Sequence, residues 1–241
     1  MPDRFGPRGV FAVIIPQQNA NMQPEYERMR PDGISNQMYR FDISDHDRVA
    51  ESVLKTVPTT LGCFPDMIIT GNSIEMRNWS AERQREYCEQ IAALTDGVPV
   101  VTATEATANA LKTMGAKRIG IVSPMSEEYS KSVQEYYETA GEVEVPYASW
   151  LQVKESKDII NVSVEKILAS FKAIDHDDVD TFLHVEGALG ITGMLEELEQ
   201  KLGRPIVSSN AATYWYALRK HGITDPMPGF GQLLMKNEIG A

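Results

Sequence analysis

Short, continuous apolar runs recur along the chain, separated by longer stretches in which the apolar residues have helical spacing. Runs that are rich in β-branched residues and do not alternate with polar ones are typical of strands buried on both faces of a parallel sheet. We predict strands over residues 10–15, 66–70, 98–102, 119–123, 181–185 and 205–208. Their alternation with helices predicts an α/β protein with mainly parallel sheets and helices on both sides of each sheet.

The stretches between the runs carry signals for helix ends. One helical pattern begins at Ser80 and ends at Asp96 and Gly97, and others cover residues 104–114, 195–202 and 214–220. Gly115 and Gly203 directly follow two of these patterns, where glycine commonly ends a helix in the left-handed conformation. In the last pattern we expect Tyr214 and Trp215 to be core aromatics of an amphipathic helix.

The order of the runs repeats itself roughly 110 residues later. Residues 10–16 resemble 118–124, residues 66–73 resemble 181–188, and residues 99–104 resemble 205–210. In this alignment Gly71 corresponds to Glu186. The repetition predicts two similar α/β halves whose strand-end loops line one shared cleft, where open α/β sheets bind ligands. We expect residues 1–115 to form the first half, completed by residues 210–241, and residues 116–210 to form the second.

Composition narrows the class of protein. The 241 residues are 42% hydrophobic and 24% charged, which is ordinary for a soluble globular protein. The net charge of −11, without a basic run or a basic-aromatic stripe, argues against a nucleic-acid partner. Because the sequence has neither a hydrophobic leader nor an apolar run of about 18 residues, we expect a cytoplasmic protein with no membrane partner.

Cofactor and metal motifs are missing from the sequence. Cys63 and Cys88 are the only cysteines, and they lack the spacing of metal ligands, so we predict no metal site. The sequence also contains no G-x-G-x-x-G fingerprint, no Walker loop, no HExxH motif and no nucleophile elbow. If the protein is an enzyme, this pattern favours chemistry without a cofactor.

Small and polar residues gather in the loops that follow the predicted strands. These loops cover residues 16–19, 71–73, 124–126, 186–188 and 208–210. Backbone N–H groups in such loops suit the binding of an anion, for example a substrate carboxylate. Serine and asparagine at these places are also ordinary helix N-caps, and for any single loop that interpretation remains open. Five such loops in pseudo-symmetric places favour a binding site.

Glu186 is the sharpest candidate for chemistry. It follows an apolar strand and precedes Gly187, which lets a ligand approach the backbone. Burial at the end of a strand should raise the pKa of its carboxyl group, which suits acid–base catalysis. The alternative is a structural carboxylate that accepts hydrogen bonds from the next helix or pairs with a nearby cation. By simple alternation His184 points to the same side as Glu186, although a lone histidine in a strand is more often a core residue.

The motifs, in order, resemble those of the aspartate/glutamate racemase superfamily, over almost the whole chain from about Val10 to Leu233. They include IIPQQN at 14–19, ITGNS at 69–73, TATEA at 102–106, IVSSNAA at 206–212 and PGFG at 228–231. The last two point to the branch of arylmalonate decarboxylases and maleate cis-trans isomerases. This resemblance implies two pseudo-symmetric Rossmann-like (flavodoxin-like) halves with the site between them.

The resemblance also implies catalytic positions. Racemases and maleate isomerases of this superfamily use two cysteines on opposite faces of a planar intermediate, whereas in the decarboxylase the first position is glycine. Here the first position is Gly71, as in the decarboxylase, and the second is Glu186 in place of the cysteine. This replacement is the main departure from the family pattern.

Further candidates for substrate binding follow from the loops and from the resemblance. Asn72, Ser73 and the Gly187 N–H match groups that hold a carboxylate in the family, and Asn19 with Pro16 matches the isomerases' Pro-x-x-Asn loop. Met125 stands where both enzymes use a tyrosine. Ser209, in the last strand-end loop, completes the set.

Three hypotheses for the function remain. The first is a cofactor-independent lyase or isomerase that acts on a small carboxylic acid through an enediolate, with Glu186 as acid/base. The second is a hydrolase or hydratase in which Glu186 activates water for attack on an amide, a cyclic imide or an unsaturated acid. The third is a binding protein that holds a carboxylate without converting it. The resemblance is also compatible with a small homo-oligomer.

Overall fold

The computed structural model describes residues 5–45, 48–71, 79–140 and 143–240. The strands are β1 Gly9–Pro16, β2 Ile34–Phe41, β3 Met67–Thr70, β4 Val100–Thr102, β5 Arg118–Ser123, β6 Glu144–Trp150, β7 Thr181–His184 and β8 Ile206–Ser208. The α-helices are α1 Met22–Met29, α2 Val49–Thr60, α3 Ala81–Ala93, α4 Ala103–Met114, α5 Glu127–Ala140, α6 Ser156–Ile159, α7 Val164–Lys172, α8 Leu195–Leu202 and α9 Ser209–Lys220. Short 3₁₀ helices are η2 Leu61–Cys63, η4 Thr192–Met194 and η5 Leu233–Met235.

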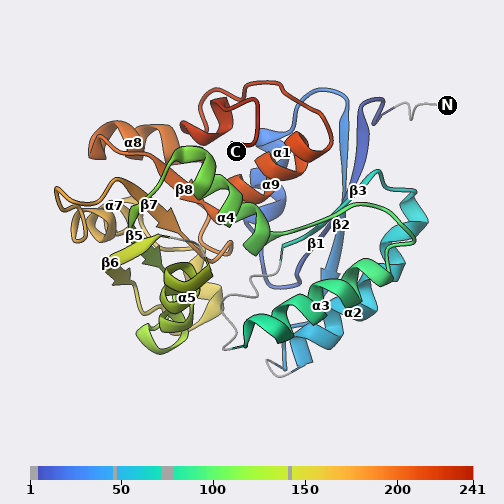
Figure 1. Cartoon of the computed structure of the whole chain (residues 1–241), viewed down its shortest axis with the longest axis horizontal. Helices are drawn as coiled ribbons and strands as arrows, with labels where there is room; N and C mark the ends of the chain where they lie inside the picture. The colour runs from blue at the N-terminus through green and yellow to red at the C-terminus, as the bar shows by residue number, and fades with distance from the viewer. Residues whose placement is uncertain (1–4, 46–47, 72–78, 141–142, 241) are drawn as a thin grey trace.

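The strands form two sheets of the same topology, which lie side by side with helices around them (Figure 1). The first has the order β2-β1-β3-β4 and the second the order β6-β5-β7-β8, and every strand pair is parallel. The predicted α/β class, the parallel sheets and the repeated architecture are therefore confirmed.

The continuous apolar runs are strands whose two faces pack against different layers. In β1, Phe11, Val13 and Ile15 belong to a core that both halves share, whereas Ala12 and Ile14 face the outer core with α2 and α3. Because both faces are buried, no polar residue marks a solvent side.

Sequence patterns missed two of the four edge strands, β2 and β6, whereas the other two, β4 and β8, were predicted. The two missed strands are mostly half-buried or exposed, and β2 carries polar residues at several positions. β6 contains Pro146, which edge strands tolerate because a proline has no N–H to donate to a neighbouring strand. Their mixed composition concealed them.

The strand register corrects one part of the sequence alignment. Asp66 and Asp180 occupy equivalent places: each donates its N–H to a neighbouring strand (to Val10 and Arg118) and accepts that residue's N–H on its carboxylate. Counting from these residues equates Gly71 with Val185, one residue before the Glu186 that the sequence alignment had chosen. The sequence alignment missed this because Asp66 was matched to Thr181, so that the aspartate before the second strand was left out.

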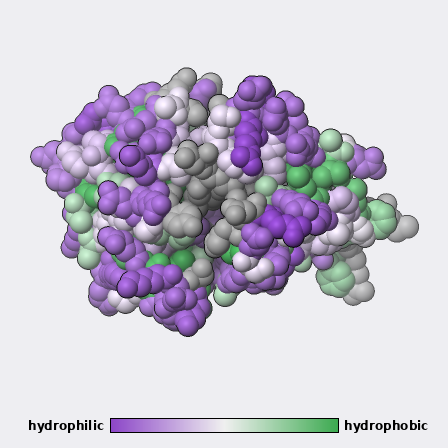
Figure 2. Space-filling view, turned by 90° about the horizontal axis from the view of Figure 1, so that it is seen from below, coloured by the Kyte–Doolittle hydropathy of each residue, from purple (hydrophilic) through white to green (hydrophobic). Residues whose placement is uncertain are grey.

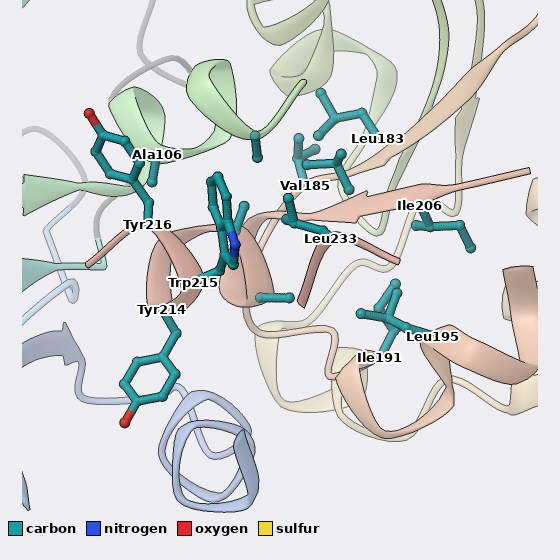
Figure 3. Close-up of a cluster of buried hydrophobic side chains, with 14 of the residues drawn as sticks. Ala106, Leu183, Val185, Ile191, Leu195, Ile206, Tyr214, Trp215, Tyr216 and Leu233 are labelled. Atoms are coloured by element: carbon teal, nitrogen blue, oxygen red, sulfur yellow. The ribbon is translucent and has the colours of Figure 1, made fainter. Parts of the chain in front are cut away.

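The last helix, α9, lies in the centre of the molecule. It begins at Ser209, earlier than predicted, and every residue from Ser209 to Arg219 is buried, so it is not the amphipathic helix that the pattern suggested. It packs against α1, α4 and elements of both sheets, which leaves no side for solvent. Tyr214 and Trp215 are core aromatics as predicted: Trp215 points into the shared core, while Tyr214 and Tyr216 point to opposite sides (Figure 3).

The predicted helix ends are largely confirmed. Ser80 caps α3 by accepting the N–H of Arg83, and Gly115 and Gly203 end α4 and α8 in the left-handed conformation. The division of the chain at residues 115 and 210 stays a prediction.

Hydrophilic residues dominate the face of the molecule seen in Figure 2, and the apolar residues on this face lie mainly toward its right-hand end. Within the described residues, no helix is both long and apolar enough to cross a membrane.

Candidate active site

The sheet topology places the strand-end loops where ligands bind in this architecture. In the order 2-1-3-4 the strand order reverses between β1 and β3, and the crevice beyond the carboxyl ends of these two strands is the usual ligand site. In the first half, Pro16 and Gly71 stand at these ends, and in the second half Met125 and Glu186 stand there. The fold thus brings the predicted site residues to matching ends of both sheets.

The Glu186 loop has an unusual backbone. Glu186 has a φ of 75°, a conformation that non-glycine residues rarely adopt. Its carbonyl oxygen accepts the N–H of Leu189 at 3.1 Å, which closes a turn. Its carboxylate oxygen Oε1 accepts the N–H of Ala188 at 3.2 Å. Burial raises the pKa of Glu186, as predicted from the sequence, and the Ala188 N–H opposes that rise in part.

Gly187 lies directly against a side chain of α9. Its carbonyl oxygen accepts a hydrogen bond from Nδ2 of Asn210 at 3.0 Å. A Cβ atom at this position would lie 2.1 Å from Oδ1 of Asn210, so no larger residue fits without displacing that side chain. The glycine therefore permits the close contact between the loop and α9.

The first-half loop is organised around the start of α1. Oδ1 of Asn19 accepts the N–H groups of Asn21 and Met22 at 3.0 and 2.9 Å, so Asn19 acts as a helix cap. Its amide NH₂ group is the part that can serve a ligand. Gly71 packs against α1 as well: a Cβ atom there would lie 2.5 Å from Cε of Met22 and 3.2 Å from the Ile14 oxygen.

Arg40 fixes the same loop from the edge strand β2. Its Nη1 donates to the carbonyl oxygens of Gln17 and Asn19 at 3.2 and 3.0 Å, and its Nη2 donates to Gln23 at 3.0 Å. Sequence analysis did not find Arg40, because the strand that carries it was not recognised.

Helix α1 also reaches across to the second half. Nδ2 of Asn21 donates to the Ala188 oxygen at 2.7 Å, and the buried Glu25 accepts the Thr192 N–H at 2.8 Å and Nδ2 of Asn210 at 2.6 Å. Sequence analysis missed these residues too. A signal existed for Glu25: it lies among the apolar positions Met22, Tyr26 and Met29 of the helix, so it is a polar residue on a buried face.

His184 and Ser209 are buried beneath the site. Nδ1 of His184 lies 3.2 Å from Oγ of Ser208, and burial lowers the pKa of His184 to about 3, so the ring is neutral. In the part of the chain that the structure describes, Nε2 of His184 and Oγ of Ser209 have no hydrogen-bond partner. His184 fits a core residue better than an acid or base.

Of the remaining candidates, Met125 lies at the end of β5, and two others cannot be placed. Met125 is half-buried against the shared core, and its carbonyl oxygen accepts the N–H of Gln152 at 3.2 Å. Asn72 and Ser73 lie outside the described residues. Among the residues described, no group of three or more His, Cys, Asp or Glu side chains could hold a metal ion.

Known proteins match the chain over most of its length. The family model for arylmalonate decarboxylase matches residues 14–234. A maleate isomerase of Alcaligenes faecalis is 24% identical over 139 residues, which cover 57% of this chain and 54% of the relative, so the alignment spans about half of that relative. A maleate isomerase of Nocardia farcinica (strain IFM 10152) is 21% identical over 249 residues, 94% of this chain and 96% of the relative.

Solved structures have the same fold. The maleate cis-trans isomerase of Nocardia farcinica bound to TRIS superimposes with a TM-score of 0.84 at 19% identity, over 94% of this chain and 97% of that chain. A crystal structure of arylmalonate decarboxylase superimposes with a TM-score of 0.79 at 19% identity, over 94% and 99% of the two chains. Because the family model runs from β1 to η5, the chain belongs to the arylmalonate decarboxylase family of enzymes.

Proposed function

We propose that this protein is a cofactor-independent lyase or isomerase that acts on a small carboxylic acid through an enediolate, with Glu186 as the acid/base. One observation carries the proposal: a carboxyl group with a raised pKa stands on a strained turn at the ligand-binding end of β7. Perturbed pKa values and rare backbone conformations both concentrate at active sites. By the resemblance, Glu186 stands at the family's second catalytic position, where the relatives have a cysteine.

The chemistry of a decarboxylation would proceed as follows. The bond between the α-carbon and one carboxylate of a malonate-like substrate breaks, carbon dioxide leaves, and the electron pair moves into the remaining carboxylate to give an enediolate. Protonated Glu186 then donates its proton to the α-carbon, and water restores the proton to Glu186. The Gly187 N–H, with Asn72 and Ser73, would stabilise the negative oxygens of the intermediate.

A mechanism that needs an acid or base on each face of the planar intermediate is disfavoured. Gly71 offers no acid or base, and Met22 occupies the space that a side chain at this position would need. Isomerisation by thiolate addition is disfavoured too, because a carboxylate is a much weaker nucleophile toward a double bond than a thiolate. One-sided proton transfer from Glu186 is what remains.

A panel of compounds followed by proton NMR in D₂O tests the proposal. The panel contains malonates, maleate-like diacids, α-substituted acids and cyclic imides, each incubated with wild type, Glu186→Gln and Glu199→Gln. Glu199 is the matched control, because it is another buried carboxyl group with a raised pKa but lies in α8. We expect deuterium at the α-carbon or loss of a carboxylate with wild type and Glu199→Gln, and a loss of at least about 100-fold with Glu186→Gln.

Other outcomes would overturn the proposal. Full turnover by Glu186→Gln would remove Glu186 from the mechanism. Opening of an imide or amide, with solvent oxygen incorporated from heavy-oxygen water, would instead establish the hydrolytic function. Saturable binding that raises the melting temperature, without conversion of any compound in the panel, would point to a carboxylate-binding protein.

A further inference from the structure

A continuous chain of hydrogen bonds links a buried carboxylate of the first half to the Glu186 loop. Oε2 of Glu25, on α1, accepts a hydrogen bond from Nδ2 of Asn210 at 2.6 Å. The same nitrogen donates to the Gly187 oxygen at 3.0 Å. An amide nitrogen carries two hydrogens, so Asn210 uses one for Glu25 and the other for Gly187.

The chain of hydrogen bonds continues through the peptide group between Gly187 and Ala188. The carbonyl of Gly187 and the N–H of Ala188 belong to the same planar peptide group, so fixing one fixes the other. That N–H donates to Oε1 of Glu186 at 3.2 Å. The direction of the peptide plane therefore determines whether the Glu186 carboxyl group keeps its hydrogen-bond donor.

The start of α1 also contacts the Glu186 loop further along, at Ala188, Gly190 and Thr192. Asn21 binds the Ala188 oxygen at 2.7 Å, and Oε1 of Glu25 accepts the Thr192 N–H at 2.8 Å. Gly190 fits between these two side chains: a Cβ atom there would lie 3.0 Å from Cβ of Asn21 and 3.1 Å from Oε1 of Glu25. The two hydrogen bonds and the packing of Gly190 thus fix the loop against Asn21 and Glu25.

We propose that Glu25 is a positioning residue that, through Asn210, fixes the peptide group between Gly187 and Ala188 and so orients the Glu186 carboxyl group. The proposal rests on the proposed function for the role of Glu186 as acid/base. Glu25 acts by accepting a hydrogen bond from the Asn210 amide, which leaves the second amide hydrogen for Gly187. A glutamine in its place has one acceptor oxygen for two donors, the Thr192 N–H and Asn210. If its NH₂ group faces Asn210, the Asn210 amide has to turn and Gly187 loses its donor; if it faces Thr192, the loop loses that anchor.

The effect can be read from Glu186 without any substrate. In the part of the chain that the structure describes, burial and the Ala188 N–H govern the pKa of Glu186, and that N–H lowers it. Loss of the oriented N–H therefore raises the pKa of Glu186 further. The charged group that faces Glu25 is Arg28, on its own helix, and the second half contributes Thr192 and Asn210 to its surroundings.

The experiment is a carbon NMR titration of the side-chain carboxyl groups of protein labelled at the glutamate Cδ, with the Glu186 signal assigned by its loss in Glu186→Gln. We expect Glu25→Gln and Asn210→Ala each to move the Glu186 titration to higher pH. Glu199→Gln is the matched control, because Glu199 is a buried carboxyl group that, like Glu25, accepts two N–H donors, in its case the backbone N–H groups of Ile206 and Gln232. It should leave the Glu186 titration unchanged.

A double variant separates positioning from stability. Glu25→Gln combined with Asn210→Asp restores a donor and an acceptor between these positions, but it leaves Gly187 without its donor. We expect the melting temperature to recover relative to Glu25→Gln while the Glu186 titration stays at higher pH. An unchanged Glu186 titration in Asn210→Ala and in the folded Glu25→Gln would overturn the proposal, and so would a full return of that titration in the double variant.

Turnover distinguishes the two proposals. On a substrate identified by the panel, Glu25→Gln should lower kcat about tenfold with KM within about twofold, because positioning rather than binding is lost. If Glu186→Gln keeps full turnover while the titration still moves in Glu25→Gln, the proposed function fails and the positioning role stands. If Glu186→Gln is inactive and the titration does not move, the positioning role fails and the proposed function stands.

Discussion

Glu186 combines an uncommon backbone conformation with a carboxyl group that burial holds toward its neutral form. A non-glycine residue in the left-handed region costs of the order of 1 kcal/mol relative to glycine, because its Cβ crowds the backbone. A protein keeps a non-glycine residue in such a conformation where its side chain is needed. The same loop carries Gly187, whose missing side chain is required for a different reason, the close approach of Asn210.

Glu186→Gly should therefore stabilise the protein while removing its activity. We expect the free energy of unfolding to rise by about 1 kcal/mol, because glycine adopts this φ without strain. Asp96→Gly is the matched control, since Asp96 has a φ of 50° outside the site. Urea denaturation of both variants checks this, and destabilisation of Glu186→Gly alone would mean that the side chain supports the fold.

The buried His184 predicts a particular dependence of stability on pH. Its pKa is lowered to about 3 by burial, from 6.5 in an unperturbed histidine. Between these values the unfolded chain binds a proton that the folded protein excludes, so the free energy of unfolding falls as the pH falls below 6.5. Relative to His184→Gln, wild type should lose about 2 kcal/mol between pH 6.5 and pH 5. Parallel stability curves from urea denaturation across this range would contradict the assignment.

At the scale of elements, the packing of the Glu186 loop on α9 explains why its second residue is glycine. Gly187→Ala should lower the free energy of unfolding by about 1–3 kcal/mol, because the new Cβ would overlap the Asn210 side chain. Gly62→Ala is the control: Gly62 lies in η2, and nothing stands within 4 Å of the place its Cβ would take. We expect Gly62→Ala to be neutral or slightly stabilising in the same denaturation experiment.

The sequence alone was enough to predict the strands that are buried on both faces and to single out Glu186 at the end of β7. Continuous apolar runs revealed the central strands, and Glu186 was identifiable as a charge at the end of such a run. The edge strands β2 and β6 escaped because their composition is mixed, and Arg40 escaped with β2. Asn21 and Glu25 escaped because their roles depend on contacts between segments about 165 to 185 residues apart, and the only local signal was a polar residue, Glu25, among buried apolar positions of its helix. Asn210 lies in a predicted binding loop, but its contact with Glu25 could not be foreseen.

At the scale of the whole molecule, α9 connects both halves to the C-terminal segment. Arg219 is buried, and its guanidinium group donates to the carbonyl oxygens of Ile223, Asp225 and Lys236 at 2.6, 3.0 and 2.8 Å. Trp215 donates to the same Lys236 oxygen at 2.8 Å. Burial lowers the pKa of Arg219, yet these acceptors satisfy its donors. The segment after α9 is thus fastened to the centre of the fold.

Arg219→Met should lower the free energy of unfolding by about 3 kcal/mol, because several buried carbonyl oxygens would lose their donor at once. Arg48→Met provides the comparison, since Arg48 pairs with Glu51 on the exposed surface and such pairs contribute little. We expect its effect to stay within about 0.5 kcal/mol. Equal effects of the two substitutions in urea denaturation would show that the Arg219 contacts do not anchor the segment.

The attachment of the Glu186 loop to α1 has a consequence for motion. Two hydrogen bonds join the second-half loop directly to the first half, from Asn21 to Ala188 and from Thr192 to Glu25. A third bond joins Glu25 to Asn210, which in turn holds the loop at Gly187. A hinge rotation that moved the second sheet away from α1 would break these bonds before it disturbed either sheet. Glu186, the proposed acid/base, would then lose its oriented hydrogen-bond donor whenever the molecule opened and regain it on closure. Admission of a ligand and proton transfer to it would therefore be separate events in time.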